Sequence, residues 1–201
     1  MISPLKIIKK SDSWERFSAN LSKLSRNDKG DCFEELTRFF LKTNPTYISK
    51  IKNIWNVNED EVPFNVKQIL NLPDADEGID LIAETYDKKF WTIQCKYKSN
   101  TKKSLNRDDV STFLDLTFNV CNESLIDLAL ICTPCEKYSY KFDKLYKRNA
   151  KFEKLYKLKE KKISFLYGTD WSKLDKEDFS KINNLINKKI INFKPIIKAQ
   201  H

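Results

Sequence analysis

The amino-acid sequence has little of several features that mark common classes of protein. Only three of the 201 residues are glycine, one is methionine, and the one histidine is residue 201. No apolar run approaches the roughly 20 residues that a membrane-spanning helix needs, and residues 1–14 lack the apolar segment and cleavage site of a signal peptide. The chain also has no GxxxxGK[ST] phosphate-binding loop. We therefore expect no membrane-spanning helix, no secretion signal and no P-loop nucleotide site.

The five cysteines, at positions 32, 95, 121, 132 and 135, are odd in number and lie mostly in apolar segments. This pattern predicts reduced thiols in a cytoplasmic protein rather than a disulfide framework. Cys132 and Cys135 have CxxC spacing, but the chain has no second pair and its histidine is terminal, which argues against a structural zinc site. We interpret the two as ordinary thiols at the end of a strand, with a redox pair as the alternative.

The net charge of +9 is compatible with a polyanionic partner such as nucleic acid. Only five of the 37 basic residues are arginine, the residue most often used for bidentate recognition of bases and phosphates. Lysine, asparagine, isoleucine, phenylalanine and tyrosine are all abundant, as an AT-rich coding sequence produces whatever the function. The charge alone does not identify the partner.

Apolar spacing predicts an alternation of helices and strands. The expected elements are a helix over residues 11–26, a second helix ending before Pro45, a helix end or short strand over 48–57, a polar connection over 58–76, strands over 79–85 and 90–97, a helix over 106–120, a strand over 125–132, a lysine-rich helix over 137–162, a strand over 163–167 and a helix over 176–187. This order predicts an α/β sandwich around a mixed sheet of four or five strands, with helices on its faces.

The N-terminal helices have recognisable boundaries in the sequence. Ser11 or Asp12 is the expected N-cap of the first helix, and the Lys-Gly-Asp at residues 29–31 is expected to end it. We accordingly divide the chain into an N-terminal helical segment over residues 1–28, a core over 29–172, and a C-terminal helix with a basic linker over 173–201. That linker resembles a lead-in to a further domain.

Two adjacent predicted strands carry polar residues where a core strand should carry none. The first begins GIDL, with Asp80, and the second reads WTIQCKYK, with Gln94 and Lys96. Side chains alternate across a strand, so Gln94 and Lys96 share one face. Asp80 reaches that face only if the loop within residues 85–89 has an odd number of residues or a bulge.

An aspartate facing a Gln-x-Lys on the next strand resembles the active site of metal-dependent phosphodiesterases of the PD-(D/E)xK type. In such a site Asp80, the Gln94 side-chain oxygen and the Cys95 backbone carbonyl would form an oxygen ligand set suited to Mg²⁺, with Mn²⁺ as a substitute. Lys96 would hold the attacking water and stabilise the transition state. Because Gln94 stands where such sites usually have an acidic residue, the site has one negative charge fewer. We expect Glu34 from the second helix to supply the missing carboxylate, with Glu35 as the alternative.

Each of these assignments has a structural alternative. Asp80 and Lys96 could form an ordinary cross-strand ion pair, with Gln94 on a solvated face. The acidic residues Asp74, Asp76 and Glu77 could supply a further ligand, although an acidic loop before a strand is usually just solvated. Among the lysines, those next to the second strand are the predicted contacts to a DNA backbone, whereas the face of the helix over 137–162 is interpreted as solvated. The predicted contact lysines are Lys98, Lys102 and Lys103.

The wider pattern is more specific than the motif. The segment KGDCFEELTRFFLKTNPTYISKIKNIW is followed in order by GIDLIAE, WTIQCKYK, STFLDL, DLALICTP and ISFLYGTDW. Over residues 29–171 this resembles the Mrr-like PD-(D/E)xK nuclease domain found at the N-terminus of single-polypeptide, helicase-type (type ISP) restriction enzymes. The resemblance implies catalytic roles for Asp80, Gln94 and Lys96 and a supporting acidic role for Glu34. Glutamine in the middle position is an accepted variant in that family.

The resemblance implies a Mg²⁺-dependent DNA endonuclease with little sequence specificity of its own. Helicase-like ATPase and methyltransferase domains or subunits would be its partners, and two copies would have to meet to cut both strands. Two other functions stay open on the sequence alone: a non-catalytic nucleic-acid-binding or scaffolding module on the same fold, and a nuclease acting on RNA or branched DNA.

Overall fold

The computed structural model describes residues 3–73, 78–106, 108–136 and 162–192, and its centre is one mixed β-sheet. The five strands lie in the order β1-β2-β3-β4-β5. β2 pairs antiparallel with both β1 and β3, whereas β4 pairs parallel with both β3 and β5. The predicted α/β sandwich around a mixed sheet is confirmed. The strands are β1 (Ile51–Asn56), β2 (Leu81–Thr85), β3 (Phe90–Cys95), β4 (Ile126–Cys132) and β5 (Ile163–Leu166).

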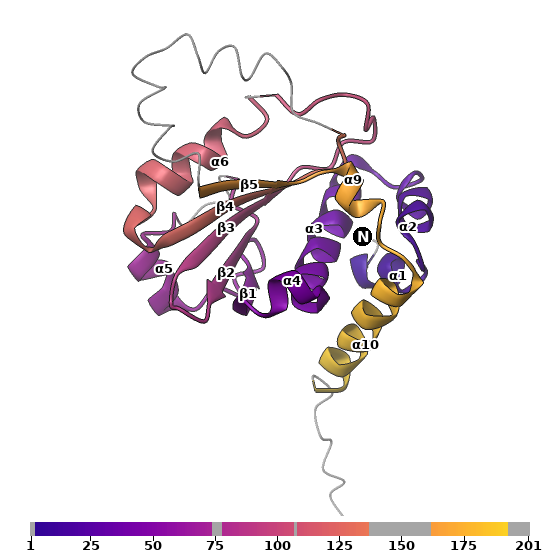
Figure 1. Ribbon diagram of the computed structural model, residues 1–201, viewed down its shortest axis with the longest axis horizontal. Coiled ribbons are helices and arrows are strands. Elements are labelled where there is room, and N and C mark those ends of the chain that lie inside the picture. Colours follow the sequence, from indigo (N-terminus) through magenta and orange to yellow (C-terminus); the bar gives the residue numbers. More distant parts are fainter. Residues whose placement is uncertain (1–2, 74–77, 107, 137–161, 193–201) are drawn as a thin grey trace, which may run out of the picture.

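Helices cover both faces of the sheet (Figure 1). One face packs against α1 (Pro4–Lys9), α2 (Trp14–Leu21), α3 (Arg26–Thr43), α4 (Pro45–Ile48), α9 (Gly168–Trp171) and α10 (Lys176–Asn192). The other packs against α5 (Phe64–Leu70), α6 (Ser111–Asp115), the π-helical turn η1 (Leu116–Val120) and the 3₁₀ turn η2 (Glu123–Leu125). Apolar side chains of the strands alternate between these two cores, as the pleat of a sheet buried on both faces requires.

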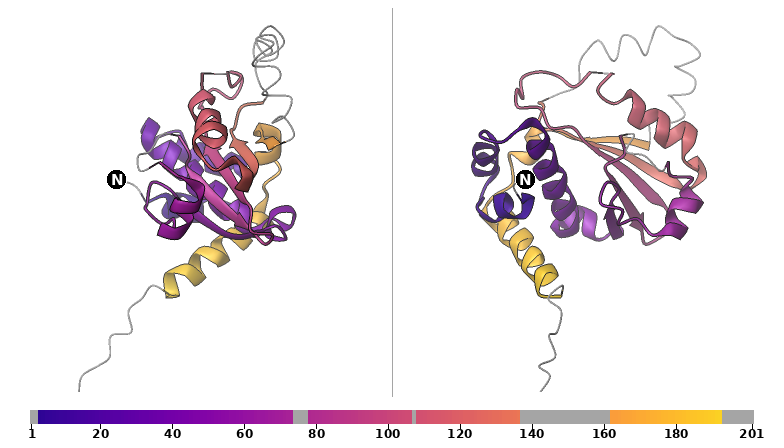
Figure 2. Two further views of the ribbon diagram at one scale, coloured as in Figure 1. Left: turned by 90° about the vertical axis from the view of Figure 1, so that its left-hand side faces the viewer. Right: turned by 180° about the vertical axis from the view of Figure 1, so that it is seen from behind.

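An aromatic cluster fixes the long helix α3 against both ends of the described chain. The ring of Trp171 in α9 lies 5.0 Å from that of Phe33 in α3 and 6.0 Å from that of Trp14 in α2, between ring centroids. Phe33 and Trp171 are fully buried. Figure 2 shows α1, α2 and α10 grouped beside α3 on this side of the sheet. Because Glu34 directly follows Phe33, this packing also sets where Glu34 lies.

Two expectations for the N-terminal helices are wrong. The N-cap of α2 is Ser13, whose side chain accepts a hydrogen bond from the Arg16 N–H, rather than Ser11 or Asp12. Residues 29–31 do not end the first helix, because α2 ends at Leu21 and α3 already runs through Gly30 from a cap at Ser25. One glycine inside a helix costs only about 1 kcal/mol, which the buried face of an 18-residue helix outweighs. The predicted division at residue 28 therefore falls inside α3.

Other elements differ in extent from the sequence prediction. The short helix α1 was not predicted, and α5 lies in what was expected to be a polar connection. The helix expected over 106–120 is shorter and divided into α6 and η1. The lysine-rich helix predicted over 137–162 lies outside the described residues except for its last residue.

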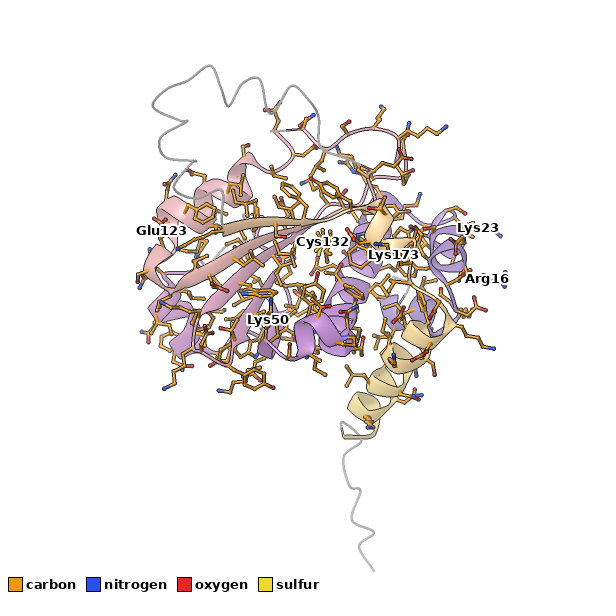
Figure 3. The ribbon with its side chains drawn as sticks, viewed as in Figure 1. Arg16, Lys23, Lys50, Glu123, Cys132 and Lys173 are labelled. Carbon is orange, nitrogen blue, oxygen red and sulfur yellow. The ribbon has the colours of Figure 1, made fainter. Side chains whose placement is uncertain are left out.

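The cysteines are free thiols in the structure, and Cys132 and Cys135 are fully buried. Figure 3 places Cys132 in the interior, between the sheet and α3. Across the described ranges, no three or more His, Cys, Asp or Glu side chains form a group that could hold a metal ion. No helix in these same ranges is long and apolar enough to cross a membrane.

Candidate functional site

The β2–β3 hairpin has the register that brings Asp80 level with Gln94. Leu81 pairs with Ile93, and continuing that register by one residue places Asp80 across from Gln94. The connecting loop, residues 86–88, has the odd number of residues that this register requires, since the main chains on either side of it are hydrogen-bonded to each other. The expected hairpin geometry is therefore confirmed.

Main-chain hydrogen bonds hold Asp80 between its two neighbouring strands. Its N–H donates to the Ile93 carbonyl at 3.0 Å, and its carbonyl accepts from the Val57 N–H at 3.0 Å. Its carboxylate oxygen Oδ2 accepts the Cys95 N–H at 2.5 Å. The Asp80 carboxylate therefore lies directly against the main chain of Cys95, the residue between Gln94 and Lys96.

Glu34 on α3 supplies a second carboxylate next to Asp80. The side chain is half-buried, and its Oε1 accepts a hydrogen bond from Asn56 Nδ2 at 2.7 Å. Burial, and then the negative charge of Asp80, raise the pKa of Glu34 to about 8, although the Asn56 hydrogen bond opposes the rise. A carboxyl whose pKa is raised by a neighbouring carboxylate in this way is suited to share a cation with it.

The reserve candidate, Glu35, is engaged elsewhere. Its Oε1 lies 2.6 Å from Nη2 of Arg38, and both side chains are buried. Arg38 also pairs with Glu61 through its other terminal nitrogen. Taking a carboxylate away from a buried guanidinium removes part of the charge compensation that burial requires, so Glu34 is the better placed of the two.

Gln94 is buried, with 5% of its surface exposed, so the alternative that puts it on a solvated face is wrong. Its Oε1 is buried and accepts no hydrogen bond from any residue that the structure describes. Gly78, at φ 113°, lies against it, and a Cβ there would be 3.4 Å from Gln94 Nε2. A buried amide oxygen without a donor is costly in a protein interior, so Gln94 has acceptor capacity for a further group.

Lys96 lies just past the end of β3, and its main chain is hydrogen-bonded to the end of β4. Its N–H donates to the Cys132 carbonyl at 2.8 Å, and its own carbonyl accepts from the Thr133 hydroxyl at 2.9 Å. Thr133 is fully buried. These bonds fix the main chain from which the half-buried Lys96 side chain extends.

Asp109 is a third acidic group, on the lysine side of the site. Burial opposes its ionisation, yet hydrogen bonds from the Asn106 N–H and Lys98, with the charge of Lys96, hold its pKa below the usual value. Lys98 is thus paired with Asp109 at 2.5 Å. Lys102 and Lys103 are exposed on the following loop. Asp74, Asp76 and Glu77 lie outside the described residues.

The donor set fits a hard divalent cation. Glu34 and Asp80 provide carboxylate oxygens, Gln94 provides a buried amide oxygen without a donor, and the Cys95 main chain adjoins Asp80. Oxygen ligands of this kind suit Mg²⁺ or Mn²⁺ rather than zinc. With only two carboxylates, the remaining ligands would be neutral oxygens.

Sequence reasoning did not find Asn56, Thr133 or Asp109, each of which contacts a predicted site residue. Asn56 and Thr133 are buried polar residues at the ends of β1 and β4. A polar residue that ends an apolar run is a weak signal by itself, because turns favour the same residue types. Their contacts depend on strand order, which one sequence does not specify.

Comparisons with known proteins agree with the fold. A family model described as a restriction endonuclease, of the Mrr catalytic type, matches residues 42–179. The DNA-bound structure of the ATP-dependent type ISP restriction-modification enzyme LlaBIII superposes with a TM-score of 0.53 and 21% identity over 81% of this chain. This chain corresponds to only 8% of that enzyme's chain. No curated protein matches. Asp80, Gln94 and Lys96 fall within the matched residues, and the chain belongs to the Mrr-type restriction endonuclease family.

Proposed function

We propose that this chain is a Mg²⁺-dependent DNA endonuclease domain of a restriction or defence enzyme, with little sequence specificity of its own. The observation that carries the proposal is the contact of the Asp80 carboxylate with the Cys95 N–H, beside Glu34 and the unpaired amide oxygen of Gln94. Membership of a restriction endonuclease family supports the reaction class.

Each residue has a role in this proposal. Bound Mg²⁺ would neutralise charge on the phosphate and lower the pKa of a water molecule. Asp80, Glu34, Gln94 and the Cys95 carbonyl would hold the ion. Lys96 would position the attacking water and stabilise negative charge on the phosphate in the transition state.

The surroundings of the site suggest how it would act on DNA. Lys102 and Lys103 would contact backbone phosphates, a form of contact that gives affinity without reading bases. The similar solved enzyme is an ATP-dependent restriction-modification enzyme bound to DNA. We propose by analogy that an ATPase and a methyltransferase act with this domain. One such site cuts one strand, so a double-strand break would require a second copy.

The test is nicking of supercoiled plasmid by purified protein with Mg²⁺ or Mn²⁺. Asp80→Ala and Lys96→Ala are each expected to reduce nicking by at least about 100-fold, as loss of a charge-stabilising group does. Lys50→Ala is the matched control, because Lys50 adjoins the opposite end of the hairpin.

The outcomes separate the competing functions. Nicking that survives in both site variants would place the activity elsewhere. Absence of nicking by the wild-type chain with either metal, even with its ATPase partner added, would favour the non-catalytic module. A panel of duplex DNA, branched DNA and RNA then compares the nuclease alternatives.

A further inference from the structure

Asn56, the last residue of β1, makes hydrogen bonds with every polar group of its side chain. Its Nδ2 donates to Glu34 Oε1 at 2.7 Å. Its Oδ1 accepts from the Asn58 N–H at 2.8 Å and from the Glu59 N–H at 3.2 Å. The side chain is buried, with 6% of the residue exposed.

The partners of the Asn56 amide determine which way it faces. Main-chain N–H groups can only donate, so the group facing the turn at residues 58–59 must be the amide oxygen. The NH₂ group must then face Glu34, whose Oε1 accepts from it. The turn after β1 therefore orients the Asn56 NH₂ group toward Glu34, one of the predicted metal ligands.

Buried groups on α3 keep the turn itself in place. The Asn56 N–H donates to Glu61 Oε2 at 3.1 Å, and the Glu61 N–H donates back to the Asn56 carbonyl at 3.2 Å. Glu61 pairs with Arg38, which is 2% exposed and also binds Glu35. A chain of bonded groups thus runs from Arg38 through Glu61 and Asn56 to Glu34.

The same turn connects the two carboxylates of the site. Val57, the next residue, donates its N–H to the Asp80 carbonyl at 3.0 Å. Asn56 itself lies opposite Leu81 in the β1–β2 ladder. One short segment therefore contacts the side chain of Glu34 and the main chain of Asp80.

We propose that Asn56 is a positioning residue that orients the Glu34 carboxylate for the metal ion, and that the Arg38–Glu61 pair holds Asn56 in place. The inference rests on the proposed function of the site, because it requires Glu34 to bind a cation. Partners of metal ligands commonly change metal affinity by about 10- to 100-fold when removed.

The experiment measures Mn²⁺ binding directly, by electron paramagnetic resonance titration of the free ion. Asn56→Ser keeps a hydroxyl that can cap the turn but is too short to reach Glu34, and Asn56→Ala removes both contacts. Each is expected to weaken Mn²⁺ binding about 10-fold or more. Asn53→Ser is the matched control, because Asn53 on the same strand donates to Glu84 at 2.7 Å, away from the site.

A second background separates positioning from general damage to the strand. In a Glu34→Ala protein, Asn56→Ser is expected to cause no further loss of Mn²⁺ affinity, since the residue through which it acts is gone. An equal loss in both backgrounds, or wild-type affinity in Asn56→Ser, would overturn the role of Asn56 alone. Failure of the wild-type chain to bind Mn²⁺ would overturn this role together with the proposed metal site.

Discussion

Among single residues, Glu34 carries a clear electrostatic cost in the fold. Its pKa of about 8 in the fold exceeds its ordinary value of 4.5, so the folded chain holds a proton there that the unfolded chain releases. The free energy of unfolding should therefore fall as pH rises from about 4.5 to 8. Glu34→Gln, which cannot ionise, should escape this loss and be more stable than the wild type by about 1–3 kcal/mol at pH 8 without metal.

Urea denaturation at pH 5 and pH 8 measures this difference. The advantage of Glu34→Gln should be small at pH 5 and grow toward pH 8. Excess Mg²⁺ should raise the stability of the wild type more than that of the variant, because a ligand stabilises the state that binds it in proportion to its affinity. An advantage that is the same at both pH values would contradict the raised pKa.

At the scale of elements, two helical glycines differ in whether the fold has room for a side chain at their positions. A Cβ at Gly168, where α9 begins, would overlap the Pro134 carbonyl oxygen and lie 3.3 Å from the Pro134 carbonyl carbon. A Cβ at Gly30, inside α3, meets nothing within 4 Å. Gly168→Ala should therefore destabilise the fold by about 2 kcal/mol, whereas Gly30→Ala should stabilise it by about 0.5–1 kcal/mol.

Thermal unfolding of the two variants beside the wild type tests this pair. Gly168 also donates its N–H to the Cys135 carbonyl. Cys135 lies two residues after Thr133, whose hydroxyl donates to the Lys96 carbonyl. We expect Gly168→Ala to reduce nicking as well, and Gly30→Ala to leave it unchanged. Equal melting temperatures for both variants would show that the loop after β4 yields to the added methyl group.

The elements that the sequence predicted well are those whose apolar period is uninterrupted. The strands β2 to β5 and the α/β alternation could be predicted from period and turn residues, whereas the segment that forms β1 was left open between a helix end and a short strand. The continuous α3 could not, because local propensity places a break at Gly30 and only tertiary packing outweighs it. The odd hairpin loop was deduced as a requirement of the site, and the structure confirms it.

Contacts between distant segments set the limit of sequence prediction at the site. Asp80, Gln94 and Lys96 lie on one hairpin, so their relation follows from strand alternation. Asn56 and Thr133 come from β1 and β4, and their contacts with Glu34 and Lys96 depend on the strand order and on the position of α3. Polar residues at strand ends are common, and only the assembled sheet distinguishes these two.

At the scale of the whole molecule, we expect the net charge of +9 to attract DNA without regard to direction, and contacts with phosphate to be concentrated beside the site. Lys102 and Lys103 are exposed on the loop after β3, whereas Lys98 is already paired with Asp109. Replacing both exposed lysines with glutamine should weaken DNA binding whatever the base sequence. It should also make the negative slope of log K against log salt concentration shallower by about 1.8, since each phosphate contact contributes about −0.9.

The matched control removes the same charge from the other end of the hairpin. Lys50 and Lys88 are exposed beside the loop at residues 86–88, away from Asp80 and Gln94, and Figure 3 shows Lys50 next to β1. Their double replacement by glutamine lowers the net charge equally but should leave the salt slope near its wild-type value. Mn²⁺ affinity should be unchanged in both double variants. If both double variants make the slope shallower to the same extent, the DNA responds to net charge alone, and the loop after β3 is not its contact surface.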